Sequence, residues 1–144
     1  MFNPSQDEVR RFFCEVYRKH CGRLPLTPLE SIAAHWVDQH PEYHAVLSDE
    51  PAALAAQFDA AGAQGNPFLH LSMHLAISEQ LSIDQPPGIR SAWERLASTL
   101  GNEHGAAHEV MECLGEVMWT AQRSGAAPDG QAYVECLRRR SGIG

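Results

Sequence analysis

The sequence predicts an all-α fold, a single compact multi-helix bundle over residues 1–144 with two central apolar helices, about 67–82 and 103–124. Three observations predict it. Apolar residues recur at intervals of three and four along most of the chain, as on the buried face of an amphipathic helix. Capping residues precede these segments, and Gly or Pro follows them. A length of 144 residues with 44% hydrophobic residues also suits one domain with its own core.

The first two helices are predicted from their capping residues. Ser5 followed by Glu8 has the spacing of a capping box, and the apolar stripe that follows ends near Gly22. Thr27 then precedes a proline and stands three residues before Glu30, which is the favoured order for a second helix start.

Prolines divide the next part of the chain. Pro41 ends the second helix and predicts a short helical turn that continues to about Leu47. Asp49, Glu50 and Pro51 indicate another start, which leads into the alanine-rich run Ala52–Ala61. That run is a candidate surface for a second copy of the chain, and residues 62–65 are expected to form a flexible loop.

The remaining helices carry the clearest signals. Asn66 and Pro67 open a helix to about Ser82 that is apolar nearly all round, which is typical of a central helix. After the break at residues 84–88, a helix ends at Gly101. Asn102 caps the long helix 103–124, and a last helix covers about 129–140. We expect Trp36, Trp93 and Trp119 to belong to the core.

The charge and the cysteines limit the classes of protein. A net charge of -7 argues against a nucleic-acid or anionic-membrane partner. No apolar run is long enough to cross a membrane, and the charged residues within Met1–Arg10 argue against a signal peptide. Four scattered cysteines without a C-x-x-C pair predict reduced, buried thiols in a cytoplasmic protein. They lie at Cys14, Cys21, Cys113 and Cys136.

Histidine spacing provides the main functional lead. Six of the eight histidines form H-x-x-x-H pairs: His40/His44, His70/His74 and His104/His108. Random placement would give about 0.4 such pairs, so the pattern is unusual. Residues four apart share one helix face, which lets both imidazoles reach one metal ion.

The predicted metal ligands come from the two apolar helices. If they pack together, their histidines and one carboxylate converge on a common patch, as in metal sites of helical bundles. The predicted metal ligands are His70, His74, His104, His108 and Glu112. Glu79, Arg90 and Glu116 are candidates for supporting contacts or ion pairs, and Arg90 is expected to hold a buried glutamate. His40 and His44 are secondary metal candidates, because Pro41 interrupts their helical geometry.

Three functional interpretations remain open. In the first, a transition metal (Zn, Fe, Mn or Ni, not distinguished by the sequence) binds the cluster, and an open coordination position activates water or binds a small ligand. In the second, the chain is a structural or interaction protein whose His/Glu cluster is a satisfied polar network. In the third, a di-iron or haem protein senses or carries a small ligand. Phosphate-binding loops, H-E-x-x-H and G-x-S-x-G are absent, so no catalytic residue is assigned.

Four stretches of the sequence resemble a known family. They are His40–His44, Asn66–Ile77, Asp84–Arg90 and Glu112–Arg123, and the resemblance covers nearly the whole chain. They resemble a proteobacterial family named as domain of unknown function eighteen forty-one. The resemblance implies a small bacterial protein with a single domain, and it brings no activity, cofactor or catalytic residue.

Overall fold

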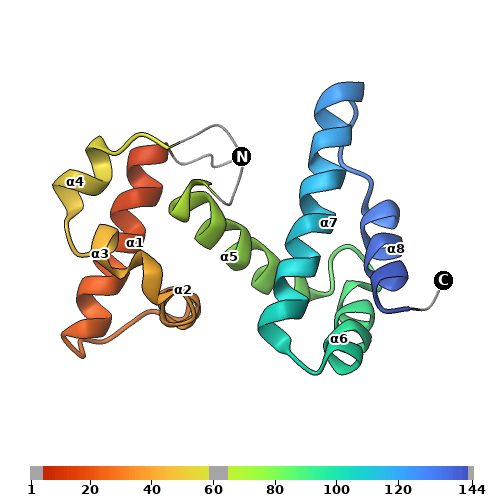
Figure 1. Cartoon of the computed structure of the whole chain (residues 1–144), viewed down its shortest axis with the longest axis horizontal. Helices are drawn as coiled ribbons and strands as arrows, with labels where there is room; N and C mark the ends of the chain where they lie inside the picture. Colours follow the sequence, from red (N-terminus) through yellow and green to blue (C-terminus); the bar gives the residue numbers. More distant parts are fainter. Residues whose placement is uncertain (1–4, 59–64, 143–144) are drawn as a thin grey trace. The chain divides into compact units, whose positions relative to one another are not determined.

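A computed structural model describes residues 5–58 and 65–142, and every regular element within these ranges is a helix (Figure 1). The predicted all-α fold is therefore confirmed. The chain divides into two compact units, Met1–Leu75 (unit 1) and Ala76–Gly144 (unit 2), with the boundary inside one helix. Each unit is described by itself. The single domain and the packing of the two apolar helices stay predictions.

Unit 1 is built from short helices and the first half of a longer one. In chain order they are α1 (Gln6–Cys21), α2 (Pro28–Asp38), the 3-10 helix η1 (Pro41–Tyr43), α3 (His44–Leu47), α4 (Glu50–Ala55) and α5 (Pro67–Ile83). The predicted capping boxes are present at Ser5 and Thr27. The Asn66 side chain accepts hydrogen bonds from the backbone N–H groups of Phe68 and Leu69, which starts α5 where the sequence predicts it.

The core of unit 1 joins residues that lie far apart in the sequence. Its fully buried members are contributed by α1, α2, α3, α4 and α5, and they include Phe13, Val16, Val37, Leu47 and Leu71. Packing of these apolar faces, more than helix propensity, holds such short helices in place.

Arg10 connects three segments of unit 1. Its guanidinium donates hydrogen bonds of 2.8 and 2.7 Å to the carbonyls of Ala53 and Ala56, at the end of α4. The same group lies 5.2 Å from the ring centre of Phe58 and 5.5 Å from that of Phe68. The rest of the predicted alanine-rich run (residues 59–61) and most of the predicted loop (residues 62–64) lie outside the described residues.

Unit 2 contains the second half of α5 and three further helices. They are α6 (Ile89–Leu100), α7 (Glu103–Ser124) and α8 (Gly130–Arg140), within one or two residues of the predicted bounds. Gly101 and Gly125 end α6 and α7 with positive φ values of 65° and 72°, a conformation that glycine adopts without strain. The buried core includes Ile89, Leu96, Val110 and Leu137.

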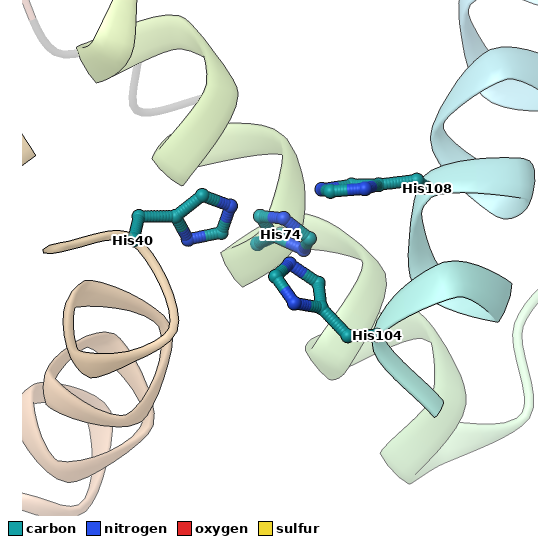
Figure 2. Close-up of side chains that lie close together, drawn as sticks. All are labelled: His40, His74, His104 and His108. Atoms are coloured by element: carbon teal, nitrogen blue, oxygen red, sulfur yellow. The ribbon is translucent and has the colours of Figure 1, made fainter. Parts of the chain in front are cut away.

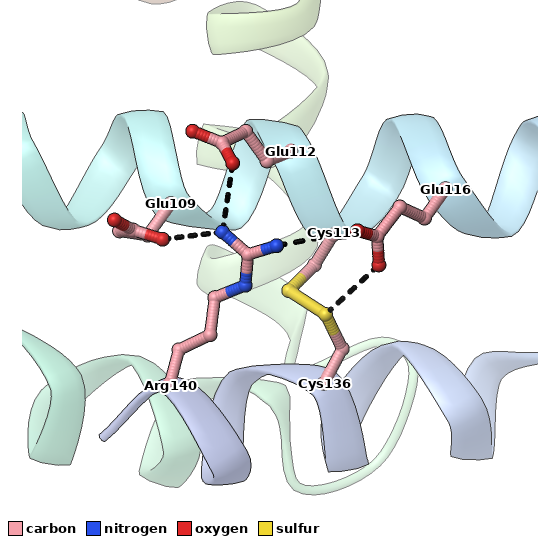
Figure 3. Close-up of polar contacts among 6 residues, drawn as sticks. All are labelled: Glu109, Glu112, Cys113, Glu116, Cys136 and Arg140. Carbon is pink, nitrogen blue, oxygen red and sulfur yellow. Dashed lines mark hydrogen bonds and ion pairs between the residues drawn. A yellow bond between two sulfur atoms is a disulfide. The ribbon is translucent and has the colours of Figure 1, made fainter. Parts of the chain in front are cut away.

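The cysteines differ from the prediction of four buried thiols. Cys113 on α7 and Cys136 on α8 form a disulfide, with their Cα atoms 5.8 Å apart (Figure 3). Cys14 is a buried free thiol, and burial raises its pKa to about 11, whereas the free Cys21 is exposed. The prediction was wrong for Cys113 and Cys136, because spacing along the chain does not show which helices become neighbours. It was also wrong for Cys21, which is exposed at the C-terminal end of α1. The cytoplasmic location, which rested on reduced cysteines, stays a prediction.

The surface of α7 also differs from the prediction. Trp119 is 59% exposed, although it was expected to belong to the core, and the neighbouring Met118 is 43% exposed. The Arg123 guanidinium lies over the Trp119 ring, 4.6 Å from its centre, so a cation–π contact replaces burial. Among the described helices, none combines the length and the apolar character that crossing a membrane requires.

Candidate metal centre

His70 and His74 lie one turn apart on α5, and both are buried in unit 1. The exposed fractions of the two residues are 8% and 0%. Their Nε2 atoms lie 3.1 Å apart, so the H-x-x-x-H spacing brings the two rings together as the sequence predicts. The candidate centre is built on this pair.

His40 completes a cluster of three imidazoles. It stands between α2 and η1, where Pro41 ends the helix and turns the chain, and it is only 2% exposed. Its Nε2 atom lies 3.1 Å from Nε2 of His70. One ring nitrogen of His40 lies within 4.8 Å of one of His74, and Figure 2 shows the His40 ring directed toward His74. We call His40, His70 and His74 the histidine cluster.

A backbone contact fixes the tautomer of His40. The Nδ1 atom lies 2.7 Å from the carbonyl oxygen of Trp36. A carbonyl oxygen can only accept, so Nδ1 carries a proton, and in the neutral ring Nε2 presents a lone pair toward His70. Imidazoles that bind metal ions are commonly oriented in this way, through a hydrogen bond from the other ring nitrogen.

Aromatic side chains enclose the cluster. The Trp36 ring stacks on His74 with centroids 4.0 Å apart and an interplanar angle of 11°. The Tyr43 ring stacks on His40 at 5.2 Å. Burial raises the pKa of Tyr43, so its hydroxyl stays protonated near neutral pH. These rings limit the orientations that the imidazoles can adopt.

The nitrogen spacing suits metal ligands. With metal–nitrogen bonds of about 2.0–2.1 Å, two ligand nitrogens are separated by about 3 Å at right angles and about 3.4 Å in a tetrahedron. The two Nε2–Nε2 distances of 3.1 Å fall in this range. His70 Nε2 lies close to both neighbours, yet one ring nitrogen has either one proton or one lone pair. It can therefore form a well-directed hydrogen bond with only one of them at a time, whereas a cation between two of these rings can accept a lone pair from each.

His44, the other secondary candidate, points elsewhere. Its Nε2 atom lies 2.9 Å from the carbonyl oxygen of Val37, and its ring lies 5.0 Å from that of Tyr17. The sequence predicts His40 and His44 as one pair with weaker geometry. The structure instead groups His40 with His70 and His74. The proline after His40 was the available signal, because it shows that the helix ends there and that His44 belongs to another turn.

His104 and His108 lie on α7 in unit 2. Their ring centroids are 4.4 Å apart, and each ring offers a nitrogen within 4.8 Å of one on the other. Both residues are partly buried, and Figure 2 shows both side chains projecting from α7. The spacing therefore places them on one face. Whether they share an ion with His70 and His74 depends on how the two units are arranged, and it stays a prediction.

Glu112 lies in a different environment from the one expected. It was expected to face inward as a ligand, but its side chain is 64% exposed and accepts a 2.8 Å hydrogen bond from Arg140 (Figure 3). Arg140 also pairs with Glu109 and Glu116. Hydrogen bonds from Arg140 to Glu112 and Glu109 raise the pKa of the guanidinium far above its usual range. These three carboxylates, spaced one helical turn apart along α7, share one arginine, whose single positive charge offsets part of their negative charge.

The Arg90 side chain forms hydrogen bonds with backbone carbonyls, and not the expected ion pair with a buried glutamate. It donates hydrogen bonds of 2.9 and 2.6 Å to the carbonyls of Leu81 and Ser82, which lack helical partners at the end of α5. Its backbone N–H donates to the Asp84 carboxylate, which lowers the pKa of that carboxyl. Glu79 is exposed, and its backbone carbonyl accepts a hydrogen bond from the Ser82 hydroxyl.

The comparisons with known proteins identify a family and nothing further. A family model described as a domain of unknown function (DUF1841) matches residues 5–139. No curated protein and no solved structure matches the chain. The functional interpretation must therefore come from the chain's own residues.

Proposed function

Because the chain belongs to the DUF1841 family, which carries no functional description, we propose its function from its own site: it binds a divalent transition-metal ion through His40, His70 and His74. The observation that carries the proposal is the approach of three buried Nε2 atoms, two of them 3.1 Å from the third. The hydrogen bond from His40 to Trp36 supports it, because it directs the His40 lone pair into the cluster.

The ligand type narrows the class of metal. Neutral imidazoles suit Zn, Ni, Cu and Fe, whereas Mg, Ca and Mn prefer oxygen ligands. Three protein ligands leave a fourth position on a tetrahedral ion, and there a bound water can be activated or a small ligand can bind. The sequence predicts His104 and His108 as further ligands, and we keep them as a separate part of the proposal. Glu112 is left out because Arg140 holds it.

The proposal is tested by metal titration of the full chain, purified without a histidine tag and stripped with a chelator. We expect about one equivalent of Zn²⁺ or Co²⁺ to bind per chain and to raise the melting temperature. His70→Gln is expected to abolish both effects, because it removes the nitrogen that both neighbours approach. The matched control is His20→Gln, since His20 belongs to unit 1 but pairs with Asp38 instead.

Two readouts separate the parts of the proposal. The visible spectrum of the Co²⁺ form reports coordination geometry and depends on the ligands. A His104→Gln/His108→Gln variant that keeps the affinity and the spectrum would remove these residues from the ligand set and leave the three-histidine site intact. Less than about a tenth of an equivalent of metal in the wild-type chain would overturn metal binding altogether.

The first alternative is a satisfied polar network with a structural role. The same contacts favour it if the imidazoles exchange protons among themselves. His74→Gln would then lower stability by the same amount with and without chelator, whereas a metal site predicts a larger loss in the metal-loaded protein. The second alternative, a di-iron or haem carrier, would show visible absorbance in the protein as purified from cells.

A further inference from the structure

The disulfide in unit 2 is independent of the histidine cluster, and it adjoins a cavity. A cavity of about 600 Å³ lies between α7 and α8, and Cys136 is among the residues that line it, together with Glu116, Val117, Ala132 and Arg139. The other sulfur belongs to Cys113, which is fully buried (0% exposed). Both cysteines are buried, with Cys136 4% exposed, but only Cys136 is among the residues that line the cavity. A small molecule in the cavity would therefore meet Cys136 before Cys113.

A carboxylate lies beside the sulfur of Cys136. Oε2 of Glu116 lies 3.5 Å from Sγ of Cys136, while its Oε1 accepts a 3.2 Å hydrogen bond from Arg140 (Figure 3). A disulfide sulfur has no proton to donate to this oxygen, but a Cys136 thiol would donate one. A carboxylate in this position therefore stabilises the reduced form of Cys136 relative to the disulfide.

We propose that Cys113–Cys136 is a site of reversible thiol–disulfide exchange, opened by low-molecular-weight thiols of the glutathione type that reach Cys136 through the α7–α8 cavity. A thiolate attacks Sγ of Cys136, forms a mixed disulfide and releases Cys113, which takes up a proton. A second thiolate attacks the sulfur of the small thiol, releases Cys136, and forms the small-molecule disulfide. Cys136 then takes up a proton and donates it in a hydrogen bond to Glu116. Two thiols are oxidised, and the protein disulfide gains two electrons and two protons.

The experiment equilibrates the full chain in buffers of reduced and oxidised glutathione over a wide range of ratios. Differential alkylation and peptide mass spectrometry give the oxidised fraction of Cys113 and Cys136 separately from the free Cys14 and Cys21. We expect a single transition between dithiol and disulfide within the range. A pair that stays entirely closed or entirely open at every ratio overturns the proposal.

Two variants test the roles of the carboxylate and the cavity. Glu116→Ala is expected to shift the equilibrium constant for exchange with glutathione about fivefold toward the protein disulfide. The control Glu112→Ala also loses a contact with Arg140, but Glu112 is not placed beside the sulfur, so the constant should change little. Ala132→Phe, one turn before Cys136 on α8, is expected to slow reduction by glutathione about fivefold by filling the cavity. Equal shifts in both glutamate variants would overturn the role of Glu116. An unchanged rate in Ala132→Phe would overturn the route through the cavity.

A conformational readout shows what the exchange controls. With the disulfide open, we expect faster amide hydrogen exchange in α8, because its covalent link to α7 is lost. The Cys113→Ala/Cys136→Ala variant serves as a permanently open reference. Exchange in α8 that is the same in the oxidised, reduced and reference proteins would show that the bond does not regulate this helix.

Discussion

Unit 1 buries three imidazoles beside one another, whereas unit 2 keeps three carboxylates near its surface around a single arginine and joins two helices by a disulfide. In unit 2 the opposite charges are supplied by the chain itself. In unit 1 the clustered nitrogens are arranged so that a cation can satisfy several of them at once. The comparison shows that histidine and glutamate signals on helices do not imply one shared site.

The two units also differ in how far apart along the chain their linked residues lie, and in whether a covalent bond joins their helices. The histidine cluster joins residues 30 positions apart, from the end of α2 to α5. The disulfide joins residues 23 positions apart on consecutive helices. Cys14 and Cys21 of unit 1 are free thiols, so neither of them links helices covalently. Noncovalent packing and, under the proposal, a metal ion must hold the segments of unit 1 together.

Matched core truncations would sharpen this difference and are expected to have the largest effects. Phe13→Ala in unit 1 and Leu137→Ala in unit 2 each remove a fully buried side chain. We expect the free energy of unfolding to fall by about 3–5 kcal/mol in the first variant and about 2–5 kcal/mol in the second. Amide hydrogen exchange should rise in unit 1 for the first variant and in unit 2 for the second. If both variants raise exchange equally along the whole chain, the units unfold together and the comparison fails.

Removing the shared arginine is expected to have an intermediate effect, confined to unit 2. Arg140→Met keeps much of the side-chain length but leaves Glu109, Glu112 and Glu116 mutually repelling along α7. The free energy of unfolding is expected to fall by about 1–2 kcal/mol, because a network of ion pairs around one guanidinium contributes more stability than an isolated surface ion pair. Urea denaturation at low and high salt measures it, and the difference from wild type should shrink at high salt. A salt-independent loss would mean that lost packing, not charge, explains the effect.

The smallest predicted effect concerns the pH dependence of unit 1. The backbone N–H of Thr27, followed by Lys19, donates hydrogen bonds to Glu30 and lowers the pKa of this carboxyl below 4.5. A folded-state pKa below the unfolded value gives stability that is present above pH 4.5 and is lost as the pH falls through the folded value. Glu30→Gln should therefore lower the melting temperature at pH 7 and flatten its decline below about pH 4.5. A decline as steep as in wild type would assign the acid sensitivity to other carboxyls.

Local sequence signals predicted the helices well. The Ser5 and Thr27 capping boxes, the Asn66 cap and the glycines after α6 and α7 each act within a few residues, so the sequence displays them directly. The clustering of His70 with His74 followed from the same short-range geometry. The all-α fold could therefore be predicted with nearly correct helix bounds.

Contacts between distant segments were harder to predict. Helical periodicity identified an apolar stripe on α7 but not its limits, so the exposure of Trp119 was missed. The partners of His40, Arg140 and Cys136 depend on which helices become neighbours, and spacing along the chain does not contain that information. The same limit explains why Glu112, correctly placed one turn from His108, was assigned to the wrong environment.

Arg10 restricts the sequence variation that this chain can tolerate. Its guanidinium bonds two carbonyls at the end of α4 and lies against the rings of Phe58 and Phe68. A lysine keeps the positive charge, but its single ammonium lacks the flat, delocalised surface that stacks on two aromatic rings. Among homologous chains, position 10 should therefore remain arginine even where neighbouring surface positions exchange arginine and lysine freely. A homologue with lysine there should carry compensating changes in the two phenylalanines.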